Sequence, residues 1–161
     1  MVSKKSLDVK IILKESYTKA IKNSVGSNLF RNFYAYVNGE KKDVLEDGVL
    51  SCAIHTSSIL SLFKLIPDVH ATVQGTVADL IKSGWIKIKK PKEGAVLVWE
   101  AKKFRNDSVH KHIGFYIGKN KAISNYSKKH RPILHHWTYG IKNGRPVRKV
   151  EQIFWNKKLD K

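Results

Sequence analysis

The order of helical and extended patterns along the chain is the feature that most constrains its fold. The first half contains helix-like apolar runs. From Trp85 onward, short runs rich in β-forming residues alternate with Gly, Pro and Asn-Gly turn signals. Two of these runs, 112–117 and 121–126, are separated by only three residues and predict a hairpin. Helices followed by an antiparallel meander predict an α+β fold.

Three segments of the first half predict helices. Residues 4–24 carry apolar side chains on one broad stripe, which is typical of an amphipathic helix. Residues 52–65 form an apolar run with Ser51 as its candidate N-cap, and a shorter helix is expected to begin after a cap at Thr76.

The chain is strongly basic, with 31 Lys and Arg against 13 Asp and Glu and a formal net charge of +18. Such a surface attracts polyanions, including nucleic acid, anionic lipid and cell-wall polymers. Lysine greatly outnumbers arginine, and it is the guanidinium fork that binds phosphates and bases bidentately. The composition therefore favours a solvated basic surface over a dedicated nucleic-acid interface.

Cysteine usage and hydropathy narrow the class further. A single cysteine excludes an internal disulfide and a CxxC zinc site. No apolar run approaches transmembrane length, and the basic N-terminus lacks the apolar region of a secretory signal. We expect a cytoplasmic protein without a membrane span, or one exported by a route without such a signal.

The lone cysteine and a distant histidine form the chemically most suggestive pair. Cys52 stands at the start of a predicted helix, where the helix dipole stabilises a thiolate. His112 opens a predicted strand, and an imidazole is the usual base that activates a thiol. The pair predicts a cysteine hydrolase site. Taken alone, a single cysteine is usually an inert core residue, and it is the pairing with His112 that favours a nucleophile.

Three motifs in the same order resemble the NlpC/P60 family within the papain-like and CHAP-like cysteine hydrolases. They are Ser-Cys-Ala-Ile at 51–54, a Pro-x-x-Gly turn feeding an apolar strand at 91–99, and His-Ile-Gly-Phe-Tyr-Ile-Gly at 112–118. In family members the last motif reads His-Val-Gly-Ile-Tyr-Ile-Gly. The resemblance implies a papain-like core of helices packed on an antiparallel sheet, with Cys52 as nucleophile and His112 as base.

The resemblance also implies an activity and a domain organisation. The expected reaction is thiol-dependent cleavage of an amide bond through an acyl-cysteine intermediate, as in a peptidase or amidase, without a cofactor. The expected substrate is a peptide, and cell-wall peptides are the first candidates to test. We expect one domain over 1–161, with 45–157 as the catalytic core. The N-terminal helix within 1–27, which the resemblance does not cover, is either peripheral to this core or completes it.

The residue that would orient His112 depends on the hairpin register. A two-residue loop at 119–120 places Asn125 on the face of His112, whereas a three-residue loop places Ser124 there. The side-chain carbonyl of Asn accepts an imidazole N–H, as in Cys-His-Asn sites, so Asn125 is preferred and Ser124 is second. His55, one turn into the predicted helix, either touches the thiol or packs in the interior.

Other histidines suggest a metal site as an alternative. His110 and His112 lie two residues apart on a strand and therefore face the same side, and His135 or His136 could add a ligand. No carboxylate stands in an obvious place to complete the set, so we expect no metal.

A basic loop directly follows the proposed site. Lys128, Lys129 and Arg131 would steer an anionic substrate, or would simply be solvated in an already basic protein. The competing hypothesis for the whole chain is a catalytically inert module of the same fold that binds nucleic acid or another polyanion. The reactivity of Cys52 distinguishes the hydrolase from the binding module, because an activated thiol is alkylated rapidly and an inert core thiol is not.

Overall fold

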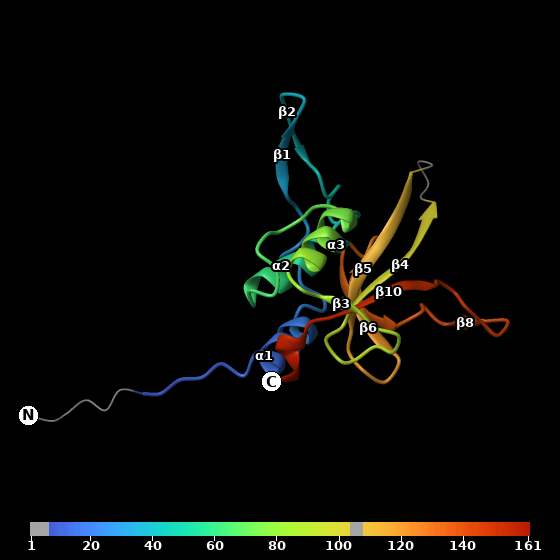
Figure 1. Cartoon of the computed structure of the whole chain (residues 1–161). Coiled ribbons are helices and arrows are strands. Elements are labelled where there is room, and N and C mark those ends of the chain that lie inside the picture. The colour runs from blue at the N-terminus through green and yellow to red at the C-terminus, as the bar shows by residue number, and fades with distance from the viewer. Residues whose placement is uncertain (1–6, 104–107) are drawn as a thin grey trace, which may run out of the picture.

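Helices on one face of an antiparallel sheet make up the α+β architecture, which confirms the class predicted from the order of sequence patterns (Figure 1). The computed structural model describes residues 7–103 and 108–161. Within these residues the helices are α1 (Leu13–Asn23), α2 (Cys52–Leu62) and α3 (Val73–Lys82), with a 3₁₀ turn, η1 (Lys157–Asp160), near the C-terminus.

The main sheet of the described residues has six strands in the order β3-β10-β4-β5-β6-β7, and every neighbouring pair is antiparallel. The strands are β3 (Ile86–Lys87), β4 (Val96–Lys103), β5 (Val109–Tyr116), β6 (Lys121–Tyr126), β7 (Arg131–His136) and β10 (Val150–Trp155). Strands β4 to β7 follow one another as the predicted meander. The last strand departs from it, because β10 returns to lie between β3 and β4.

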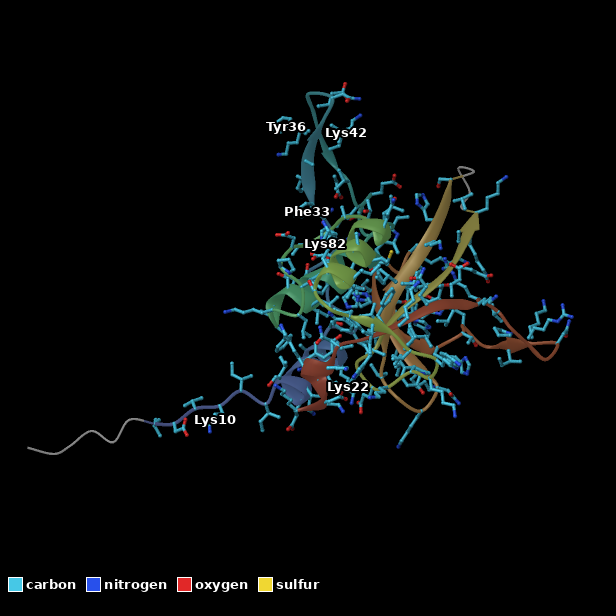
Figure 2. The ribbon with its side chains drawn as sticks, in the orientation of Figure 1. Lys10, Lys22, Phe33, Tyr36, Lys42 and Lys82 are labelled. Carbon is cyan, nitrogen blue, oxygen red and sulfur yellow. The ribbon has the colours of Figure 1, made fainter. Side chains whose placement is uncertain are left out.

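Two short hairpins project from the body of the molecule (Figure 1). They pair β1 (Tyr34–Val37) with β2 (Glu40–Asp43), and β8 (Ile141–Lys142) with β9 (Arg145–Pro146). Both turn through Asn-Gly pairs in which the Asn and the Gly have positive φ, the conformation that this dipeptide favours. Figure 2 shows Tyr36 and Lys42 on the first hairpin, with Phe33 at its base, away from the sheet.

Two helix starts differ from the sequence predictions. Residues 7–12 are exposed and non-helical, because their apolar side chains have no core to pack against and a helix of this kind depends on that packing. Helix α3 begins at Val73, before Thr76. Its cap is Thr72, whose side chain accepts a hydrogen bond from the Gly75 N–H at 3.0 Å.

The helices cover the face of the sheet that carries the main apolar core. On β5, Ile113 and Phe115 join this core, so His112 and Gly114 point to the opposite face, since successive residues of a strand alternate. Fully buried members of the core come from all three helices and four strands: Tyr17, Ile21, Leu60, Leu80, Val96, Phe115, Ile123 and Phe154.

The opposite face carries a smaller cluster centred on Trp99. The segment between β7 and β10 folds across it. Trp99 Nε1 donates to the Trp137 carbonyl at 2.7 Å, and the rings of Trp99 and Tyr139 pack with centroids 5.7 Å apart. No helix within residues 7–103 or 108–161 has the length and apolar character to cross a membrane.

Candidate active site

Cys52 is the first residue of α2, and its thiol is partly buried. Ser51 occupies the cap position as predicted, but its buried hydroxyl makes no capping bond. Burial raises the pKa of the Cys52 thiol, and the backbone N–H groups of Ile113, Ala53 and Cys52 itself oppose that rise. The Ile113 N–H comes from β5, so the thiol lies against the strand immediately after His112.

His112 lies on β5, and only one of its two ring nitrogens forms a hydrogen bond to a described residue. Its Nε2 is 2.9 Å from Ser124 Oγ, and its ring lies 5.3 Å from that of Trp99. The Nδ1 atom makes no hydrogen bond to any residue that the structure describes. Burial lowers the pKa of His112 well below its ordinary value, and the nearby charge of Arg148 lowers it further.

Cys52 and His112 line the same cleft, which has a volume of about 1200 Å³. Its walls include Asn125, on the helix side of the sheet, and Tyr139, from the segment across the other side, so the cleft crosses the end of the sheet. The lining is apolar along α3 and the loop before α2. Along β4, β5 and the loop that carries Arg148 it is cationic.

The hairpin register is the three-residue-loop alternative, and the two-residue loop is wrong. Phe115 pairs with Ile123, which sets Gly114 opposite Ser124. Gly114 lets β6 approach closely, since a Cβ there would lie 2.5 Å from Ser124 Cβ and 2.6 Å from the Ile123 carbonyl oxygen. Ser124 is thus in contact with His112. Asn125 instead donates through Nδ2 to the Gly48 carbonyl at 2.7 Å.

The hydrogen bonds around Ser124 assign the protons of both histidines. His135 Nδ1 lies 2.8 Å from the His136 carbonyl oxygen, so Nδ1 carries the proton. Burial lowers the pKa of His135 to about 4, and its neutral Nε2 accepts the Ser124 hydroxyl proton at 2.8 Å. Ser124 Oγ then accepts from the Tyr139 hydroxyl at 3.0 Å and from His112 Nε2 at 2.9 Å. His112, protonated on Nε2 and neutral, therefore has a lone pair on Nδ1.

The pKa shifts describe a neutral resting pair. Burial raises the pKa of the Cys52 thiol and lowers that of the His112 imidazole, so both groups are uncharged near neutral pH. A neutral imidazole with an unprotonated Nδ1 is a general base. In such an arrangement a thiol proton can pass to the imidazole during attack on a carbonyl, without a thiolate forming first.

The other predicted site residues lie in different surroundings. His55 is fully buried in the core between Phe30 and Phe115, where its Nε2 bonds Ser24 Oγ at 2.9 Å. It packs in the interior, which is one of its two predicted placements.

The basic loop contributes unequally to the cleft. Lys128 is part of its lining, whereas Lys129 and Arg131 are exposed and lie outside that lining. Within the described residues no group of three or more His, Cys, Asp or Glu side chains could hold a metal ion.

No protein-family model and no curated protein matches the chain.

The roles of three residues of the site were not predicted from the sequence. His135 was considered only as a metal ligand, and neither Tyr139 nor Arg148 was singled out. All three belong to the β7–β10 region, which reaches the site through the fold. The only sequence signal was the clustering of histidine and aromatic residues in 135–139.

Proposed function

We propose that the protein is a thiol-dependent hydrolase of the NlpC/P60-like, papain-like class, which cleaves an amide bond through an acyl-cysteine intermediate. One observation carries the proposal. A partly buried thiol at the start of a helix shares a cleft with an imidazole whose hydrogen bonds leave Nδ1 unprotonated.

The proposed reaction has two stages. As Cys52 Sγ bonds to the substrate carbonyl carbon, its proton moves to His112 Nδ1. The C–N bond then breaks, and the same proton passes to the departing amine. In the second stage water attacks the thioester, gives one proton to His112 and releases the acid. That proton returns to the thiolate.

Backbone N–H groups supply the stabilisation that the tetrahedral intermediate needs. The N–H groups of Cys52 and Ala53 lie at the start of α2 and face the thiol. Donors in this position are suited to bind the developing oxyanion. Ser124 orients the base, and Asn125 holds the loop before α2 through Gly48.

The test uses p-nitrophenyl acetate, a neutral activated ester. We expect a burst of nitrophenolate and a single acetyl group on Cys52, located by peptide mapping, and no such product in Cys52→Ala. His112→Gln keeps a polar partner for Ser124 but cannot act as a base, and should slow acetylation by roughly 100-fold. His70→Gln is the matched control, because His70 also bonds through Nε2, to Asp79 at 2.7 Å, and neither residue lines the cleft.

A basic binding module on the same fold is the second candidate. Two observations favour it. The raised pKa of the Cys52 thiol indicates an unreactive thiol, and the net charge of +18 indicates a surface that binds polyanions. Absence of acetylation at Cys52, together with DNA or RNA binding that weakens steeply with salt, would replace the hydrolase with this module. If an acyl enzyme forms, peptide and cell-wall peptide substrates are the next to be screened.

A further inference from the structure

Arg148 presents a guanidinium group to the cleft that contains Cys52. The residue lies just before β10, and the return of that strand to β4 brings it to the site. Its Nε and Nη2 donate to the Glu100 carbonyl at 3.1 and 2.9 Å, and Nη2 also reaches the His110 carbonyl at 3.3 Å. The other terminal nitrogen, Nη1, makes no hydrogen bond to a described residue.

Arg148 forms no ion pair with a carboxylate of the described residues. Its three bonds go to neutral carbonyls, and burial lowers its pKa, with the charge of Glu100 among the groups that oppose this. A partly buried cation of this kind is costly unless an anion pairs with it. By contrast, Arg31 meets both carboxylate oxygens of Asp47, at 2.6 and 2.7 Å.

The rest of the cleft has the same electrostatic character. Among its described lining residues there are four lysines and Arg148, but no aspartate or glutamate. One of the lysines, Lys111, is paired with Glu151 at 2.7 Å, whereas Arg148 is half-buried and bonds no carboxylate of the described residues. The charge of Arg148 also acts on the thiol and on Tyr139, which places it within electrostatic reach of both.

We propose that Arg148 binds a carboxylate of the substrate, so that the cleft selects peptides or acyl donors with a carboxylate close to the scissile bond. As a statement about a substrate, this rests on the proposed function. As a statement about binding, it does not need the chemistry. The guanidinium fork suits a carboxylate, and the apolar wall that includes Leu50 and Val77 suits an uncharged part of the same molecule.

The carboxylate could belong to a side chain or to a chain terminus, and three related probes separate these sources. N-acetylglutamate α-amide has only the side-chain carboxylate, N-acetylglutamine has only the α-carboxylate, and N-acetylglutamine α-amide is neutral. Each is titrated into the Cys52→Ala variant while NMR follows the Arg148 Nε–H resonance. We expect one acidic probe to shift this resonance and to bind about tenfold or more tightly than the neutral one.

Substitutions test whether the guanidinium is responsible. In the same Cys52→Ala background, Arg148→Gln should weaken the acidic probe about tenfold to the level of the neutral one, and Arg148→Lys should give an intermediate loss. Arg145→Gln removes the same charge from β9, outside the lining of the cleft, and should change binding less than about twofold. Equal binding of all three probes, or a charge preference that survives Arg148→Gln, would overturn the proposal.

The resonance of the Arg148 side chain is read in a protein that retains Arg148, so a failure of Arg148→Gln to fold does not block the test. An acidic probe that binds without moving this resonance would also overturn the proposal. The outcome is independent of acetylation at Cys52 by the neutral ester, so failure of the carboxylate site and failure of the hydrolase are distinguishable.

Discussion

The two faces of the main sheet are built from the same strands but bury different chemistry. On the helix side, apolar side chains from the three helices pack against Ile113 and Phe115. On the other side, Trp99 lies against His112, which belongs to a set of hydrogen-bonded polar groups. Strand β5 contributes to both because its residues alternate in direction. A single strand thus contributes apolar side chains to the core on one side and His112 to the polar groups on the other.

Two buried histidines show the same contrast at the scale of a residue. In the helix-side core, His55 bonds Ser24 through Nε2, while its buried Nδ1 has no partner and aromatic rings enclose it. An unpaired nitrogen in a sealed core only costs stability. His112 also leaves Nδ1 without a hydrogen-bond partner among the described residues, but it lines the cleft that holds Cys52. There the same unpaired nitrogen is the base of the proposed reaction.

The largest effect is predicted for the loss of His135 from the polar face of the sheet. In His135→Phe, Ser124 loses the acceptor of its proton and donates to His112 Nε2, which moves the His112 proton to Nδ1 and removes the base. We expect acetylation of Cys52 to slow by roughly 100-fold while the fold persists. Nitrogen-15 NMR of His112 reports the tautomer directly.

A conservative variant makes this prediction specific. The side-chain oxygen of His135→Gln can still accept from Ser124, so a large part of the rate should return, together with the Nε2–H tautomer of His112. If His112 has the same tautomer in wild type and in His135→Phe, the assigned proton arrangement is wrong.

The second effect forces the two strands of the site apart. Gly114→Ala would place a Cβ 2.5 Å from Ser124 Cβ and 2.6 Å from a backbone oxygen, so β6 must move. We expect a loss of roughly 1–3 kcal/mol in the free energy of unfolding, measured in urea, and slower acetylation as Ser124 leaves His112. Gly75→Ala is the control, since its new Cβ meets only side-chain atoms, and it should cost less than about 1 kcal/mol.

The third effect is a loss of stability in acid that arises from His55 in the helix-side core. Burial lowers the pKa of His55 to about 3, so on acidification the unfolded chain binds a proton that the folded protein excludes. Stability is therefore lost as the pH falls below about 6.5, and His55 accounts for about 2 kcal/mol of that loss by about pH 5.

Urea unfolding of His55→Leu at several pH values tests this sign. Its stability relative to wild type should improve by about 2 kcal/mol between about pH 7 and pH 5. Phe30→Leu alters the same packing without a titrating group, so its difference from wild type should not vary with pH. A constant difference for both variants would exclude His55 as a source of acid lability.

The smallest effect compares two helix caps. The Thr72 side chain accepts from Gly75 N–H, so Thr72→Ala should cost about 1 kcal/mol of unfolding free energy. The Ser51 hydroxyl is buried without a partner, so Ser51→Ala should cost less than about 0.5 kcal/mol or should stabilise the protein. Equal losses in the two variants would mean that Ser51 does cap α2.

Local patterns were sufficient to predict the coarse organisation of this chain. The succession of helical and extended runs identified the α+β class, the apolar run after Ser51 placed Cys52 at a helix start, and alternation placed His112 on a strand. These features depend on residues a few positions apart, so periodicity, caps and turn signals reveal them. The exposed stretch 7–12 shows the limit, since an apolar stripe forms a helix only where something covers it.

Only the tertiary structure decided which polar groups meet at the cleft. The register that selects Ser124 over Asn125 depends on how closely β6 can approach Gly114, and His135 and Arg148 arrive through strand pairings far along the chain. Contacts of this kind depend on sheet order and close packing, which no local pattern records. The sequence by itself placed Cys52 at a helix start and His112 on a strand, while the fold determined the proton arrangement of His112 and the cation in the same cleft.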